Sequence, residues 1–158
     1  MARELTITVD TPTCTGCRVC EMVCSLFHEK VTNIEKARLR ITDRWDDSLF
    51  EPHICQLCDD APCVAACPTS ALSQDERGVV KVDQDACNGC AACMSACQYD
   101  AIYYQDEFQR LFVCDRCDGD PTCVKFCFTK SLILGKPEAQ PATGVEAEQK
   151  EWTKRFAH

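Results

Sequence analysis

Short segments in which hydrophobic and polar residues alternate recur along this chain, and they predict strands of only a few residues. In the segment 37–45, Leu39 and Ile41 alternate with charged or polar neighbours, which is typical of a half-buried strand. The segments 6–14 and 79–87 begin with a similar strand-like stretch and can be aligned with each other. No apolar run approaches the length that is needed to cross a bilayer.

A small residue followed by an aliphatic one recurs at three places, each four residues after a cysteine. Each pair is predicted to pack the end of a short helix and to lead into a strand of a small hairpin. We interpret the segment 30–52, which contains the predicted strand at 37–45, as an insertion that caps one end of the domain. The three pairs are Ala71-Leu72, Ala101-Ile102 and Ser131-Leu132.

The sixteen cysteines of the 158-residue chain change this picture, because they fall into four runs with one spacing rule. In every run two cysteines lie three residues apart, a third follows after a short loop, and the fourth comes four residues after the third. This is the bacterial ferredoxin arrangement for [4Fe–4S] clusters, with a longer spacer before the third cysteine in the second and fourth runs. The runs are 14–24, 55–67, 87–97 and 114–127.

Four thiolates for each cubane cluster account for all sixteen cysteines, so the sequence predicts four [4Fe–4S] clusters. The first three cysteines of a run can reach one cube from a tight loop. The third and fourth, such as Cys63 and Cys67, are expected on one face of a short helix, which directs the fourth sulfur to a neighbouring cube. A chain that holds four clusters is predicted to conduct electrons.

Disulfide bonds and zinc sites are two other uses of closely spaced cysteines. A cysteine content of one residue in ten is typical of secreted disulfide scaffolds, but cysteines at two-residue intervals make an awkward disulfide framework. Zinc sites use C-x-x-C pairs, but zinc knuckles come as two separated pairs rather than a triplet with an offset fourth cysteine. The spacing therefore favours iron–sulfur clusters over both.

Charge and composition exclude several classes of function. The formal net charge is −8, and ligated clusters would add further negative charge, so nucleic acid is disfavoured as a partner. The chain lacks a glycine-rich nucleotide fingerprint and a paired catalytic acid and base. The N-terminal stretch has no secretory signal, and reduced thiols suit cluster assembly, so we expect a cytoplasmic protein without a catalytic site of its own.

A few polar residues are candidates for adjusting cluster potentials. The three histidines, His28, His53 and His158, are scattered and expected to be solvated, with the alternative that His28 or His53 donates a hydrogen bond to a nearby cluster. Three basic residues lie within the cysteine runs, where they either raise local potentials or face water. They are Arg18, Arg116 and Lys125.

The four cysteine runs alternate between two spacer lengths along the chain. Runs one and three share the short spacing, and runs two and four share the longer one, as expected for a duplicated two-cluster unit. We predict an α+β fold of tandem bacterial-ferredoxin-like modules, with short helices and small antiparallel β-hairpins around four cubane clusters, over residues 1–135. The remaining residues, 136–158, are predicted to form a polar linker and a possible docking helix.

The four runs, with the longer spacer in two of them, resemble the four-cluster electron-transfer subunits that accompany molybdenum and tungsten oxidoreductases, formate-linked hydrogenases and carbon monoxide dehydrogenase systems. The resemblance covers residues 3–135 and includes all sixteen cysteines. Residues 14–29 and the strand after them look most like the small soluble members encoded beside tungsten-type aldehyde oxidoreductases. The resemblance implies a catalytic molybdenum- or tungsten-cofactor subunit as one partner. A second redox protein, either a flavoprotein reductase or a ferredoxin, would be the other, and copies of the chain could also associate into a longer wire.

The resemblance also implies how the runs share their ligands, with the outer runs exchanging their fourth cysteines and the inner runs doing the same. The alternating repeat by itself would equally permit exchange between runs one and two and between runs three and four. The implied ligand sets are Cys14, Cys17, Cys20 and Cys127; Cys114, Cys117, Cys123 and Cys24; Cys55, Cys58, Cys63 and Cys97; and Cys87, Cys90, Cys93 and Cys67.

The function that the sequence favours is therefore relay of single electrons between a catalytic subunit, in this reading an aldehyde oxidoreductase, and a second redox partner. The alternatives are a free-standing polyferredoxin without a fixed partner, or the electron-transfer subunit of a formate dehydrogenase, hydrogenase or carbon monoxide dehydrogenase system. An oxygen-sensing regulatory protein is a third class, which the lack of any DNA-binding or enzymatic module disfavours.

Overall fold

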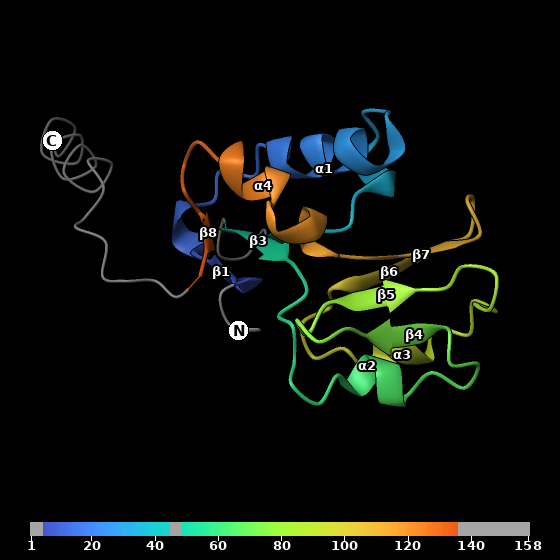
Figure 1. Ribbon diagram of the computed structural model, residues 1–158. Coiled ribbons are helices and arrows are strands. Elements are labelled where there is room, and N and C mark those ends of the chain that lie inside the picture. Colours follow the sequence, from blue (N-terminus) through green and yellow to red (C-terminus); the bar gives the residue numbers. More distant parts are fainter. Residues whose placement is uncertain (1–4, 45–48, 136–158) are drawn as a thin grey trace, which may run out of the picture.

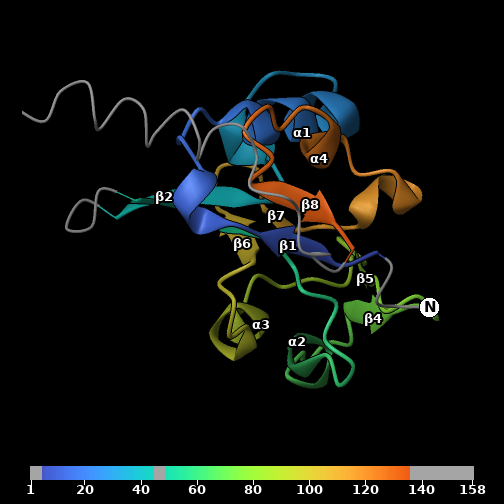
Figure 2. The ribbon, with the colours of Figure 1, turned by 90° about the vertical axis from the view of Figure 1, so that its left-hand side faces the viewer.

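The computed structural model describes residues 5–44 and 49–135, and it places two pairs of short helices at opposite ends with hairpins between them (Figure 1). At one end α1 (Val19–Glu29) packs against α4 (Thr122–Lys125). At the other end α2 (Pro62–Ala65) packs against α3 (Ala92–Ala96). The view at right angles shows the same separation of the two helix pairs (Figure 2).

The strands of the described residues form four antiparallel pairs, each of only two strands. The first pair joins distant parts of the chain, because Ile7 lies opposite Leu134 and so brings run one beside run four. The predicted α+β fold with short helices and small hairpins is confirmed. The pairs are β1 (Ile7–Val9) with β8 (Leu132–Leu134), β2 (Arg40–Arg44) with β3 (Leu49–His53), β4 (Leu72–Gln74) with β5 (Val80–Val82), and β6 (Ile102–Gln105) with β7 (Arg110–Val113).

The small-plus-aliphatic pairs lead into strands as predicted. Strands β4, β6 and β8 each begin at the aliphatic residue, and the small residue before it is buried. Three single 3₁₀ turns complete the described elements. They are η2 (Thr11–Thr13), η3 (Ile34–Lys36) and η4 (Arg116–Gly119).

The helices differ from the prediction that each would carry a third and a fourth cysteine. Only α1 contains both, Cys20 and Cys24, whereas α2 ends at Ala65 and leaves Cys67 beyond it. After α2 the chain turns more tightly, with the amide of Cys67 bonded to the carbonyl of Val64, three residues earlier, at 3.2 Å.

The physical reason lies in where the backbone first turns left-handed after the fourth cysteine. In runs two, three and four this happens three residues on, at Ser70, Asp100 and Lys130, and a strand follows. In run one it happens six residues on, at Lys30, which forms the left-handed C-cap of α1. The helix of run one is therefore longer than the others.

The insertion predicted at 30–52 forms the β2–β3 hairpin in its described part, and Leu39 and Ile41 are buried as the alternation indicated. Residues 136–158 lie outside the described residues, so the predicted division of the chain and its docking helix stay predictions. Among the described residues no helix is long and apolar enough to span a membrane.

Candidate metal centres

All sixteen cysteines lie within the described residues, and every one is a free thiol. Most of them are buried or half-buried, and only Cys17 and Cys90 are exposed. No disulfide therefore joins the described cysteines in this structure.

Twelve of the thiols gather around three cavities, and each cavity combines three cysteines of one run with the fourth cysteine of another. We name them sites I, II and III. Site I is lined by Cys14, Cys17, Cys20 and Cys127; site II by Cys55, Cys58, Cys63 and Cys97; and site III by Cys67, Cys87, Cys90 and Cys93.

The remaining four cysteines also lie together, and we name them site IV: Cys24, Cys114, Cys117 and Cys123. Cys24 interacts electrostatically with Cys114 and Cys117, and Cys123 interacts with all three. These groupings agree with exchange of fourth cysteines between the outer runs and between the inner runs. Ligation itself stays a prediction for each of the sixteen residues.

The four sites follow one another in a line. Site I adjoins site IV, because Cys20 lies close enough to Cys123 to interact with it electrostatically. Site IV adjoins site II through Cys114 and Cys55. Site II adjoins site III, since α2 packs on α3 and their runs exchange the fourth cysteine. The order is therefore I, IV, II, III.

A left-handed residue directly before the second cysteine shapes the loop of every run. In the short runs it is a glycine, Gly16 (φ 66°) or Gly89 (φ 69°). In the longer runs Leu57 (φ 52°) and Arg116 (φ 63°) occupy the same position, and both side chains are buried. L-residues rarely adopt this conformation, so its recurrence marks a constraint that the loop imposes at the sites.

Burial sets the acid–base properties of several of the thiols. Burial raises the pKa of Cys20 and of Cys24 to about 12, and the pKa of Cys55 and of Cys93 to about 11. Such thiols keep their protons at neutral pH until a metal displaces them, because the thiolate is the form that binds metal.

A buried polar atom without a hydrogen-bond partner provides an independent test of whether anionic clusters fit these sites. The side chain of Arg116 is completely buried, and its Nε atom has no hydrogen-bond partner. A buried guanidinium needs nearby negative charge, because its own charge is otherwise removed from water without compensation. Ligated [4Fe–4S] clusters are anions, so the residues present fit them.

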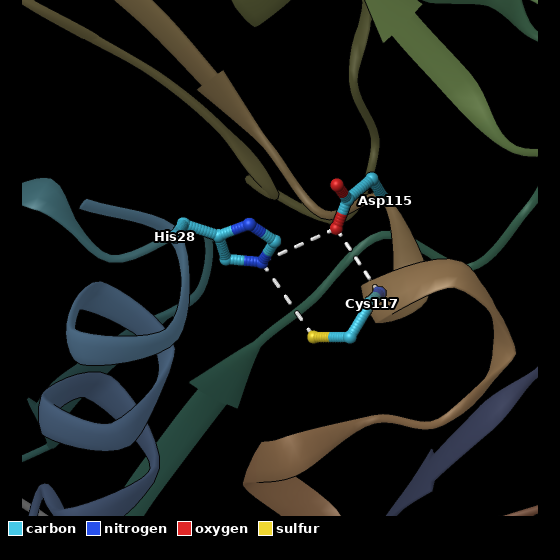
Figure 3. Close-up of side chains that lie close together, drawn as sticks. All are labelled: His28, Asp115 and Cys117. Atoms are coloured by element: carbon cyan, nitrogen blue, oxygen red, sulfur yellow. Dashed lines mark hydrogen bonds and ion pairs between the residues drawn. The ribbon is translucent and has the colours of Figure 1, made fainter. Parts of the chain in front are cut away.

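His28, which was expected to be solvated, is instead only 8% exposed and lies beside site IV. Figure 3 shows its ring, carried by α1, facing two residues of run four. The Nε2 atom lies 3.5 Å from the Sγ of Cys117 and 3.3 Å from Oδ1 of Asp115. Asp115 also pairs with Arg38 and accepts the amide of Cys117 at 3.1 Å. The alternative prediction for His28, a hydrogen bond near a cluster, matches this geometry.

The other candidate tuning residues are bonded to groups other than sulfur, although Arg18 also lines the cavity of site I. His53 contacts the Thr42 hydroxyl and the carbonyl of Tyr99. Arg18 is 35% exposed and pairs with carboxylates, and Lys125 is 54% exposed and pairs with Asp120. His158 lies outside the described residues.

Sequence reasoning missed a set of threonines that touch cysteine sulfurs. The hydroxyls of Thr69 and Thr129 lie 3.6 Å from the sulfurs of Cys67 and Cys127, each two residues earlier. The hydrogen bond from Thr69 lowers the pKa of Cys67. The sequence contains a pattern that could have predicted these contacts, because a threonine follows the fourth cysteine by two residues in both of the longer runs.

Comparison with known proteins identifies the family of the chain. The chain matches the 4Fe-4S dicluster domain over residues 46–137, which is more than half of its length. It is 42% identical over 115 residues to the aliphatic sulfonate oxidoreductase, polyferredoxin-like subunit of Pyrococcus furiosus, covering 72% of this chain and 66% of that protein. The chain spans slightly less than two thirds of the length of the first relatives that it matches.

Two further relatives cover more of the chain. It is 32% identical over 148 residues to the probable anaerobic dimethyl sulfoxide reductase chain YnfG of Escherichia coli, covering 82% of this chain and 72% of that one. It is 30% identical over 140 residues to the thiosulfate reductase electron transfer subunit PhsB of Salmonella typhi, covering 80% and 73%.

These relatives bear out the prediction of a [4Fe–4S] protein, and the sixteen cysteines in ferredoxin motifs are consistent with four clusters. They include electron-transfer subunits of oxidoreductase complexes, which agrees with the prediction that the chain has no catalytic site of its own. The chain therefore belongs to the 4Fe-4S dicluster domain family and is an iron–sulfur protein of the ferredoxin-like type.

Proposed function

We propose that this protein is the electron-transfer subunit of a molybdenum- or tungsten-dependent oxidoreductase complex. The observation that carries the proposal is the continuous line of four cysteine sites, in the order I, IV, II, III, through one small domain. Clusters bound at these sites would supply one-electron redox chemistry. A line of such sites has two ends, which suits a relay between two partners.

The chain's own residues form these sites and adjust their reduction potentials. The thiols of each run supply the ligands, and the left-handed residue before the second cysteine turns each loop. Side-chain donors reach the sulfurs at particular sites, as His28 does at site IV and Thr69 at site III. Such contacts favour the more negative, reduced state of the bound group, so sites with different donors are expected to differ in potential.

The relatives guide the proposal for the partner. Those named above are subunits of an aliphatic sulfonate oxidoreductase, of a probable dimethyl sulfoxide reductase and of a thiosulfate reductase. We propose that a separate catalytic subunit occupies one end of the line, and a flavoprotein reductase or a ferredoxin the other. The aldehyde oxidoreductase that the family resemblance implies is our first candidate. An aliphatic sulfonate oxidoreductase is the second, favoured by the 42% identity to the Pyrococcus protein.

Charge and thiol chemistry add two expectations to the proposal. The chain's net charge of −8 suits docking on a basic patch of each partner, which speeds encounter between redox proteins. The cytoplasm is the proposed compartment, because its reducing conditions keep sixteen thiols available for cluster assembly.

Anaerobic affinity purification from the native organism tests the proposal. We expect a large catalytic chain to co-purify in a fixed ratio, with molybdenum or tungsten in the complex, and the substrate that reduces the clusters then separates aldehyde from sulfonate oxidation. Recovery of the protein alone, holding its clusters and accepting electrons from several unrelated donors, would favour the free-standing polyferredoxin. A zinc-filled protein without visible absorption would exclude both.

A further inference from the structure

The side chain of Arg116 lies in the protein interior and contacts residues of two sites. It is completely buried. The Nη1 atom donates to the Sγ of Cys114, in site IV, at 3.6 Å. The Nη2 atom donates to the carbonyl oxygen of Cys55, in site II. The guanidinium therefore lies at the middle junction of the line of sites.

The charge of this guanidinium has no carboxylate partner in the described part of the chain. Other arginines there form such pairs, as Arg38 does with Asp115 and Arg110 with Glu29. Arg116 instead contacts one sulfur and one carbonyl, and its Nε atom is left without a partner. Because arginine does not lose its proton in proteins, this buried charge must be balanced by the sites on either side.

The loop geometry of run four holds Arg116 in this place. The same position is a glycine in runs one and three, and all three residues from Arg116 to Asp118 have positive φ, at 63°, 48° and 58°. Consecutive left-handed residues are unfavourable for L-amino acids, and such strain persists where surrounding contacts enforce it. In this turn the backbone directs the arginine side chain inward.

The two end sites lack an equivalent charge. The cavities of sites II and III are both lined by no basic residue, but at site II Arg116 bonds to the Cys55 carbonyl from outside the cavity. The cavity of site I is lined by Arg18, which is partly exposed and is paired with both Glu21 and Asp43. Paired and partly solvated charges act weakly on their surroundings, whereas a buried unpaired one acts strongly.

We propose that Arg116 is a charge bridge that raises the reduction potentials of sites IV and II above those of sites I and III. This inference rests on the proposed electron-transfer function. A positive charge beside a redox group stabilises the added electron, so the two middle sites are where electrons reside between partners. The same charge lowers the repulsion between the two neighbouring anionic sites.

Potentials of the isolated, anaerobically purified protein test this without any partner or catalytic assay. Arg116→Gln removes the charge and keeps an amide that can donate to the Cys55 carbonyl, whereas Arg116→Lys keeps the charge. Lys125→Gln is the matched control, because it removes a positive charge from the same run at a side chain that is 54% exposed. Each variant is titrated by redox potentiometry with detection by electron paramagnetic resonance, and its iron is counted.

We expect two of the four reduction steps to move to lower potential in Arg116→Gln. A shift of about 59 mV in each would correspond to a tenfold change in a one-electron equilibrium. Arg116→Lys should restore most of the shift, and Lys125→Gln should leave all four steps close to the wild-type values. The proposal is overturned if Arg116→Gln moves the steps no further than the Lys125 control does.

Loss of iron from Arg116→Gln would also decide the question. The proposal then requires that the clusters of sites IV and II are lost while those of sites I and III remain, because only the first two flank the missing charge. The opposite pattern, or equal loss from all four sites, would overturn it. Failure of the proposed function gives a different result, a wild-type protein that does not hold four iron–sulfur clusters or finds no redox partner.

Discussion

The Nε2 atom of His28 lies 3.5 Å from the Sγ of Cys117, although the two residues are separated by 89 positions in the chain. The contact exists because α1 continues past Cys24 to Glu29 and so carries His28 over to run four. Asp115 lies 3.3 Å from the same nitrogen and holds the ring in place. The imidazole of His28 thereby links the helix of run one to a sulfur of site IV.

Replacing His28 with phenylalanine should lower the reduction potential of site IV. The ring is kept but the donor is lost, and one hydrogen bond to a charged sulfur corresponds to an effect on the order of 1 kcal/mol, or roughly 40 mV for one electron. Potentiometric titration of the purified protein measures the change. His53→Phe is the control, since His53 bonds to Thr42 and Tyr99. Equal behaviour of the two variants would argue against the contact.

Exchange of the fourth cysteines predicts opposite losses in two variants that differ by one helical turn. Cys24→Ser should damage the cluster of site IV, because Cys24 lies with Cys114 and Cys117. Cys20→Ser should damage that of site I, where Cys20 lines the cavity with Cys14 and Cys127. Paramagnetic resonance spectra of the reduced variants would then lack different signals. Loss of the same signal from both variants would contradict crossed ligation.

Sequence patterns predicted the local parts of this fold well, because cysteine spacing and small-plus-aliphatic pairs act over a few residues. They did not reveal that Arg116 is buried or that His28 is near Cys117. Both depend on backbone turns, the left-handed residue before Cys117 and the delayed end of α1. A charged or polar residue at such a position carries no local sign of whether it faces water or a sulfur.

Removal of iron should destabilise the fold as a whole. Four two-stranded pairs and short helices enclose little apolar volume without the clusters, and Arg116 would remain buried without an anionic neighbour. The intact protein is expected to contain about sixteen irons per chain, as four [4Fe–4S] clusters require. Chelation under anaerobic conditions should abolish the slow hydrogen exchange of the hairpins, and reconstitution with iron and sulfide should restore it. An iron-free chain that keeps its protected amides would show that the fold does not need clusters.

The glycine that precedes the second cysteine of run one is predicted to be required for a steric reason as well as a conformational one. A Cβ at Gly16 would lie 2.6 Å from the Cγ of Phe50, a side chain of the β3 strand, and the residue has φ of 66°. Run three repeats the arrangement, where a Cβ at Gly89 would lie 2.8 Å from the Cζ of Tyr104. An aromatic ring from a following hairpin thus covers each short loop closely.

Gly16→Ala should therefore lower stability by more than the roughly 1 kcal/mol that a left-handed alanine costs by itself. Gly135→Ala separates the two effects, because Gly135 has φ of 90° and nothing lies within 4 Å of its added Cβ. Thermal unfolding of the anaerobic proteins, with iron counted before and after, gives the comparison. Adding Phe50→Ala to Gly16→Ala removes the ring and should leave a smaller penalty than the two single changes add up to. If Gly16→Ala and Gly135→Ala unfold at the same temperature, the close contact with Phe50 does not constrain the loop.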